Sequence, residues 1–221
     1  MSCRSEALQG FVDAASAAFS QLAQDPEARR TVAQVFCALE TVSMPRSGPG
    51  SQLPVCAHLP CALAVTTSHD SLHSLLERFK SIEPLLEWRR RPTYDDSGSE
   101  NFPQGHANTM IIGPGGLEDR RDVWLGASLM APKVRYPDHN HEPEEVYLVL
   151  SEGQFRQGEG EWFSPGVGGS FYNTSGIRHA MRSLDTPLLA FWVLRVREDD
   201  FAGHQVQMAT ASVLEEGDVA G

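Results

Sequence analysis

The second half of the sequence is divided into short β-type segments by glycine and proline, and this punctuation constrains the fold more than any other feature. Apolar or alternating segments are predicted to form strands at residues 106–112, 123–130, 146–150, 154–156, 169–172, 178–182 and 188–196. Many short strands with turns at short intervals are typical of an antiparallel sandwich or a small barrel. The sequence therefore predicts a mainly β domain over residues 101–200.

The first hundred residues carry a helical pattern instead. Apolar residues recur at spacings of three and four over residues 7–22, 26–39 and 67–82. The second run follows Asp25 and Pro26, a usual start of a helix because aspartate caps the first turn and proline fits its first position. We expect a helical extension over residues 1–100 and an acidic C-terminal tail over residues 201–221. The apolar stripes of the helices require a partner, and a homodimer contact is one candidate.

Charge and hydropathy exclude several classes of function. Eighteen lysines and arginines against 29 aspartates and glutamates give a formal net charge of −11, which argues against nucleic acid as a partner. No apolar run is long enough to cross a bilayer and the N-terminus lacks the apolar core of a signal peptide, so we expect a cytoplasmic protein. The run Arg89, Arg90 and Arg91 is expected to form a solvated turn or to contact an acidic surface rather than a ligand.

The motif with the clearest chemistry contains two histidines and a glutamate. Alternate residues of a strand share a face, so His139 and His141 can point together into a barrel interior, and Glu145 has the same parity. Imidazole and carboxylate together suit one divalent first-row transition metal ion. His179, on a later predicted strand, is the candidate fourth ligand. The ligand types do not identify the metal, because Fe, Mn, Zn, Co and Ni all accept them.

These residues resemble the two-part signature of the cupins, small β-barrels that hold one metal ion. The residues that carry the resemblance are His139, His141, Glu145, Gly153, Pro165, Gly166 and His179. Two features depart from the general cupin pattern. Seven residues rather than six separate the glutamate from the first glycine, and the usual Pro-x-Gly-x-x-His spacing of the second part is absent. The resemblance implies a mainly β cupin (double-stranded β-helix or jelly-roll) barrel with an N-terminal α-helical extension.

Within the cupins, the sequence is most similar to the lyases of dimethylsulfoniopropionate (DMSP), and among them to the DddL type. The similarity extends from the third predicted helix to Arg197, and its marks are Tyr136, Tyr147, the segments 105–108 and 113–116, residues 178–182 and the helical extension. It implies a carbon-sulfur lyase that depends on a metal ion. The substrate would be the zwitterion DMSP, and the products would be dimethyl sulfide and acrylate.

The resemblance also implies roles for aromatic residues in this β-elimination. Tyr147 is the expected general base, because a bound metal ion would favour ionisation of a nearby tyrosine; the alternative role is a hydrogen bond to a metal ligand. Tyr136 is a candidate for orienting the substrate carboxylate or, alternatively, for capping the strand. Tyr172 and Trp192 are candidates for contact with the sulfonium methyl groups, with ordinary barrel core as the alternative for both.

Two other functions stay open from the residues. Histidines and a carboxylate around a metal with open positions also suit iron and O₂, so a cupin dioxygenase is one alternative. A lyase continues to turn over without oxygen and a dioxygenase stops. The other alternative is a non-catalytic cupin that binds a small ligand, which would bind DMSP without converting it.

Overall fold

The structure is a computed structural model that describes residues 3–46, 48–92 and 94–197. The acidic tail expected over residues 201–221 lies outside these residues. Helices occupy the first part of the chain and strands the second, which confirms the predicted mainly β fold with an N-terminal helical extension. The division at residue 100 stays a prediction. Among the described helices, none combines the length and the apolar character needed to span a membrane.

The three long helices lie where the apolar periodicity predicts them: α1 Glu6–Leu22, α2 Pro26–Ala38 and α4 Asp70–Ile82. The Asp25 carboxylate caps α2 by accepting hydrogen bonds from the backbone N–H groups of Glu27 and Ala28. The third helix begins three residues later than predicted. Shorter helical elements complete this part: η1 Pro54–His58, α3 Leu59–Leu63, η2 Glu83–Leu85 and α5 Phe102–Gly105.

The seven predicted strands are present within two residues of their expected bounds. They are β3 His106–Ile112, β5 Val123–Met130, β6 Glu144–Val149, β7 Gly153–Gln157, β8 Ser170–Asn173, β9 His179–Ser183 and β10 Leu188–Arg195. The short strands β1 Met44–Pro45, β2 Trp88–Arg89 and β4 Glu118–Asp119 were not predicted. The larger sheet has the order β1-β4-β3-β5-β10-β6-β8, with β2 added beside β3, and β7 and β9 form a separate two-stranded sheet.

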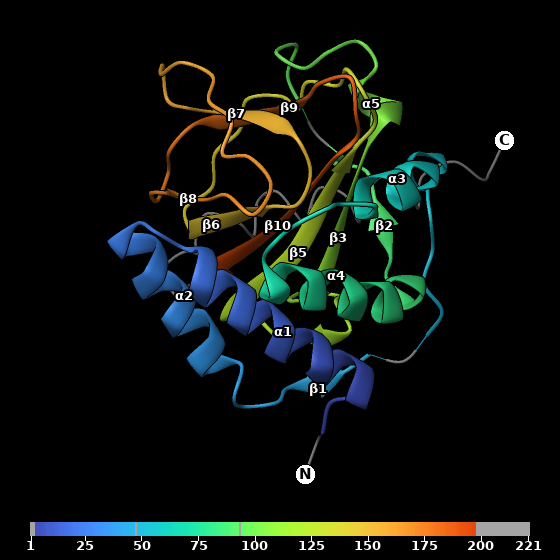
Figure 1. The fold of residues 1–221 in the computed structure, drawn as a ribbon, viewed down its shortest axis with the longest axis vertical. Helices are drawn as coiled ribbons and strands as arrows, with labels where there is room; N and C mark the ends of the chain where they lie inside the picture. The colour runs from blue at the N-terminus through green and yellow to red at the C-terminus, as the bar shows by residue number, and fades with distance from the viewer. Residues whose placement is uncertain (1–2, 47, 93, 198–221) are drawn as a thin grey trace, which may run out of the picture.

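The larger sheet has two differently covered faces. In Figure 1, α1, α2 and α4 lie together at the bottom, β7 and β9 lie at the top, and the long strands β3, β5 and β10 run between them. On the helical side, Phe191 of β10 packs against Phe11 of α1 and Phe79 of α4, with ring centroids 5.7 and 4.9 Å apart. The sheet is therefore the partner that the helix stripes require, and the stripes give no argument for a homodimer.

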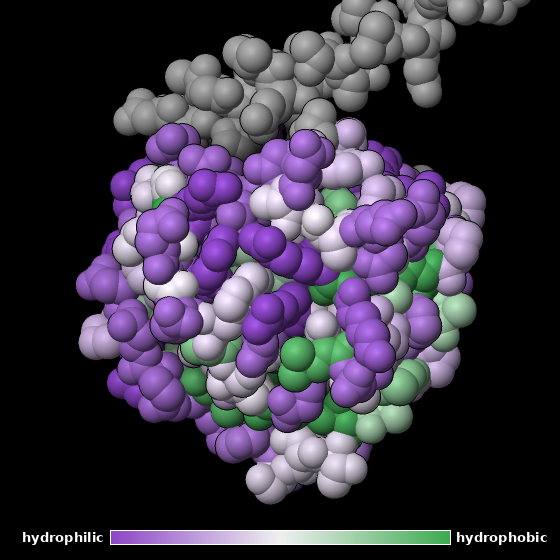
Figure 2. Space-filling view, turned by 90° about the horizontal axis from the view of Figure 1, so that it is seen from above, coloured by the Kyte–Doolittle hydropathy of each residue, from purple (hydrophilic) through white to green (hydrophobic). Residues whose placement is uncertain are grey.

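The opposite face of the larger sheet meets the small sheet around a second apolar cluster, which includes Tyr136, Tyr147, Phe155 and Met181. Alternation along the strands assigns residues to the two faces, so Tyr147 and Trp192, which are directly opposite each other on β6 and β10, both face away from the helices. Seen from the end that carries the small sheet, the surface is mostly hydrophilic, with small apolar areas between polar side chains (Figure 2). The chemistry expected from the sequence belongs to this half of the molecule.

Candidate metal centre and cavity

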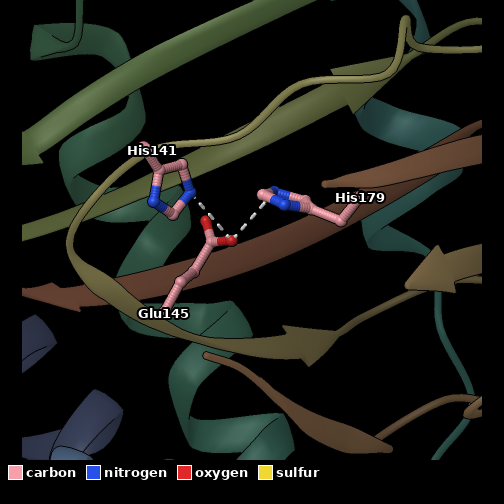
Figure 3. Close-up of side chains that lie close together, drawn as sticks. All are labelled: His141, Glu145 and His179. Carbon is pink, nitrogen blue, oxygen red and sulfur yellow. Dashed lines mark hydrogen bonds and ion pairs between the residues drawn. The ribbon is translucent and has the colours of Figure 1, made fainter. Parts of the chain in front are cut away.

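Three of the four expected metal ligands meet at one point. Glu145 is on β6, His179 opens β9, and His141 lies in the loop before β6. Their ligand atoms lie within 4.8 Å of one another. One oxygen of Glu145, Oε2, is 3.3 Å from Nε2 of His141 and 3.3 Å from Nε2 of His179 (Figure 3). Side chains from two sheets and a loop thus converge on a single position.

The fourth expected ligand, His139, lies beside this group. Its backbone pairs with that of His179 through two hydrogen bonds of 3.0 and 2.8 Å. The ring centroid of His139 is 4.1 Å from that of His179 and 6.4 Å from that of His141. His139 is therefore adjacent to the three residues but is not part of the compact group of ligand atoms, and its role as a ligand stays a prediction.

The three histidines share one hydrogen-bonding arrangement. In each, Nδ1 lies 2.9 Å from a backbone carbonyl oxygen two residues away; these carbonyls belong to Pro137, Pro143 and Ile177. A carbonyl only accepts, so each Nδ1 carries the proton and donates it. In the neutral form of each ring, Nε2 then keeps a lone pair, which is the form in which imidazole binds a metal ion.

These donor atoms fit a divalent metal ion. Nε2 of His141 and Oε2 of Glu145, 3.3 Å apart, need a shared proton or a cation between them, and a bound metal ion can replace that proton. Ligand atoms bound at 2.0–2.2 Å around one metal ion are roughly 2.8–3.6 Å apart, which includes this separation. Nε2 of His179 is buried without a hydrogen-bond partner among the described residues. The group could hold a metal ion, whose identity the donor types leave open.

Electrostatics in this group reflects its burial. Burial alone would raise the pKa of Glu145, but His141 and His179 hold it far below its usual range. Burial opposes protonation of His141, but the Glu145 carboxylate prevails and raises the pKa of that imidazole. Burial and the charge of His179 hold the pKa of His139 well below its usual value. The carboxylate is thus ionised and His139 is neutral, as metal ligands need to be.

A second layer of side chains holds Glu145. Asn173 is fully buried on β8 directly opposite Glu145, and its Nδ2 donates to Oε2 of the carboxylate at 2.9 Å. The amide oxygen of Asn173 accepts in turn from Nε2 of Gln157 at 2.7 Å. Nothing in the sequence marked Asn173, because its role follows from the pairing of β8 with β6.

A cavity of about 310 Å³ opens beside the ligand group. It is lined by six of the candidates proposed from the sequence: Tyr136, Tyr147, Trp192 and the expected ligands His139, His141 and Glu145. Other side chains that line it are Asn108, Met110, Trp124, Ser128, Met181 and Leu194. The lining residues of β3, β5, β6 and β10 have the parity that faces away from the helices.

Two hydrogen bonds hold aromatic side chains of the cavity wall. Nδ2 of Asn108 donates to the hydroxyl oxygen of Tyr136 at 2.9 Å. The indole N–H of Trp192 donates to Oγ of Ser128 at 3.0 Å. Tyr147 is buried and stacked on Phe171, with ring centroids 5.1 Å apart, and burial together with the Glu145 charge raises its pKa well above the usual value.

Two expectations from the sequence do not fit these positions. Tyr172 lies opposite Val146 on the other face of the sheet and packs against the helical core, because its parity on β8 is opposite to that of Phe171. It does not line the cavity, so it is no longer a substrate-binding candidate. The three arginines at 89–91 were expected to avoid a ligand site, but all three line the cavity.

Comparison with known proteins points to one enzyme family. Residues 27–190 match the family model described as dimethylsulfoniopropionate lyase. The DMSP lyase DddQ of Ruegeria pomeroyi (strain ATCC 700808 / DSM 15171 / DSS-3) is 27% identical over 173 residues, which are 76% of this chain and 83% of that protein.

Solved structures support the same architecture. The crystal structure of DMSP lyase DddQ from Ruegeria pomeroyi DSS-3 matches with a TM-score of 0.68 and 22% identity over 89% of this chain and 94% of that chain. A structure described under DMSP lyases RdDddP and RnDddQII matches with a TM-score of 0.64 and 23% identity, over 86% of this chain and 92% of that chain. The expected cupin-type fold is confirmed. The similarity found is to DddQ, so the DddL subtype expected from the sequence is not supported.

Proposed function

The chain belongs to the DMSP lyase family, and we propose that it cleaves DMSP to dimethyl sulfide and acrylate in the cavity beside His141, Glu145 and His179. The observation that carries this proposal is the meeting of ionised Glu145 with two ligand-ready imidazoles at the edge of a cavity walled by tyrosine and tryptophan. His139, beside them, would complete the set of ligands. A metal ion, when bound, supplies positive charge that neutralises the substrate carboxylate and stabilises the negative charge that develops on it.

Tyr147 is the proposed general base. Its phenolate would take a proton from the carbon next to the carboxylate; the electrons of that C–H bond form the C=C bond of acrylate, and those of the C–S bond leave with sulfur as neutral dimethyl sulfide. Burial and the Glu145 charge raise the pKa of Tyr147, which opposes this role. When a cation balances the charge of Glu145, this carboxylate raises the pKa of Tyr147 less.

Tyr136 and Trp192 are the proposed substrate-binding residues. Because Asn108 donates to the Tyr136 hydroxyl oxygen, the hydroxyl proton of Tyr136 is available for donation to a substrate carboxylate. Ser128 accepts from the Trp192 indole and holds the ring in the cavity wall. An aromatic face attracts a sulfonium group and its methyl groups through cation–π and apolar contact.

Tyr147→Phe tests the base. We expect this variant to keep its fold and its metal content and to lose dimethyl sulfide release, because only the phenolic oxygen is removed. Tyr172→Phe is the matched control, since it removes the same atom from the other face of the sheet. Headspace gas chromatography and elemental analysis measure the two quantities. Near wild-type turnover by Tyr147→Phe with DMSP would show that another residue takes the proton.

A further inference from the structure

The lining of the cavity is basic although the protein is strongly acidic. The chain carries a formal net charge of −11, yet the lining of the cavity includes the consecutive residues Arg89, Arg90 and Arg91. Glu145 is the one carboxylate among the lining residues, and its charge faces the candidate metal ligands. The residues that line the cavity thus include three arginines and a single carboxylate, so positive charge is in excess there.

Of the three arginines, Arg91 is the least exposed and lies nearest to a residue proposed to bind the substrate. Arg89 forms an ion pair with Glu87, a carboxylate that also accepts from Arg46 at 2.6 Å. Arg90 is exposed. Arg91 is half-buried, and its guanidinium carbon lies 5.8 Å from the centroid of the Tyr136 ring.

The guanidinium of Arg91 lies at the part of the cavity wall that Tyr136 forms. A carboxylate that accepts from the Tyr136 hydroxyl would therefore lie close to this guanidinium. Guanidinium binds carboxylate through two parallel N–H donors, which makes it selective for that group.

A buried histidine outside the ligand group fixes the backbone of Arg91. The backbone N–H of Arg91 donates to Nε2 of His106 at 2.8 Å, and Nδ1 of His106 lies 2.6 Å from the carbonyl oxygen of Phe102. The His106 ring is also stacked on the Phe102 ring, with centroids 3.7 Å apart. Since the carbonyl only accepts, His106 is neutral in the tautomer that accepts from Arg91. The segment that carries Arg91 is therefore attached to the β3 strand rather than left as a solvated turn.

We propose that Arg91 binds the carboxylate of the substrate and of the product acrylate, and so makes the cavity specific for carboxylate-bearing molecules. This inference rests on the proposed function, which supplies the carboxylate. The sulfonium end of the substrate would be repelled by the same charge and directed toward the Trp192 wall. His106 acts as a positioning residue for the Arg91 backbone.

Binding of acrylate to the full-length, metal-loaded protein tests this inference without requiring turnover. By isothermal titration calorimetry, we expect Arg91→Met to raise the dissociation constant for acrylate about 10- to 100-fold, the range for loss of a charge-assisted contact. Arg90→Met, the matched control, removes the same charge from the neighbouring exposed position and should change it less than about threefold. Metal content should equal that of the wild type in both variants. Arg91→Gln replaces Arg91→Met if the latter does not fold.

Two results would overturn the inference. One is wild-type affinity for acrylate in the Arg91 variant. The other is an equal loss of acrylate affinity in the Arg91 and Arg90 variants, which would indicate long-range electrostatic attraction rather than a direct contact with Arg91. The Michaelis constant for DMSP should rise with the acrylate dissociation constant while the turnover number changes little. Failure of the proposed function gives a different result, in which the wild type binds acrylate through Arg91 but releases no dimethyl sulfide from DMSP.

Discussion

Replacement of Asn173 by leucine should weaken metal binding without unfolding the protein. Asn173 is fully buried and donates at 2.9 Å to the same Glu145 oxygen that lies 3.3 Å from His141 and His179. Without this amide, the carboxylate loses a donor that fixes its rotation. Leucine has the branching and the number of side-chain heavy atoms of asparagine but no amide donor or acceptor, and Gln157 keeps its hydrogen bond of 2.6 Å to the Tyr172 carbonyl. The change therefore removes mainly the polar contact.

Two independent estimates agree on the size of the effect. A hydrogen bond to a charged group contributes about 1.5–3 kcal/mol. Loss of an outer partner of a metal ligand usually costs about 10–100-fold in affinity, which corresponds to about 1.4–2.7 kcal/mol. We therefore expect the metal dissociation constant of Asn173→Leu to rise about 10- to 100-fold.

Competition with a chromophoric chelator, titrated with Mn²⁺, Co²⁺ and Zn²⁺ in turn, measures this constant, and circular dichroism checks the fold. Ser170→Ala is the matched control on the same strand, because the Ser170 hydroxyl is buried without a hydrogen-bond partner among the described residues and lies opposite Leu148 rather than Glu145. Unchanged metal affinity in a folded Asn173→Leu protein would refute the reasoning, since Glu145 would then need no orientation by Asn173 or would not be a ligand.

Three further predictions concern stability and the cavity wall. Burial lowers the pKa of His106 to about 4, so the unfolded chain binds a proton that the native protein refuses; stability should fall by about 3 kcal/mol from this group as the pH drops from about 6.5 to 4. Urea denaturation across this pH range should show a smaller loss of unfolding free energy for His106→Leu than for the wild type. Equal losses in the two proteins would show that the pKa of His106 is not the cause. A Cβ at Gly126 would lie 2.2 Å from the Trp192 ring and 2.5 Å from the Thr109 carbonyl oxygen, so Gly126→Ala should cost about 1–3 kcal/mol and raise the Michaelis constant for DMSP at unchanged metal content. A chelator should lower the melting temperature of the metal-loaded protein. Added metal at 100 times its dissociation constant should raise the free energy of unfolding of the stripped protein by about 2.7 kcal/mol. A melting temperature that changes with neither treatment would argue against a metal site.

Local patterns in the sequence were sufficient for the seven longer strands and for three of the four candidate metal ligands. The alternation of side chains along a strand is a local property, so β3 and β5 begin and end as predicted. The close spacing of His141 and Glu145 likewise predicted that they share a site, and the structure brings both to His179.

Contacts that depend on strand pairing could not be read from the sequence in this way. Tyr172 is adjacent in sequence to Phe171 and Asn173, but the register of β8 against β6 turns it toward the helices. The arginines at 89–91 carry no local sign of a cavity, because their placement follows from the pairing of β2 with β3, which sets Arg89 opposite Asn108. Such register is decided by packing between distant segments.

Metal-dependent release of dimethyl sulfide is the central claim, and one measurement tests it most directly. The full-length protein is stripped with a chelator, reconstituted with Fe²⁺, Mn²⁺, Co²⁺, Ni²⁺ or Zn²⁺ in turn, and incubated with DMSP under strict anaerobiosis while headspace gas and acrylate are quantified. We expect equal amounts of dimethyl sulfide and acrylate from at least one reconstituted form and none from the stripped protein. Release that is unaffected by chelation, or that requires oxygen, would contradict the account.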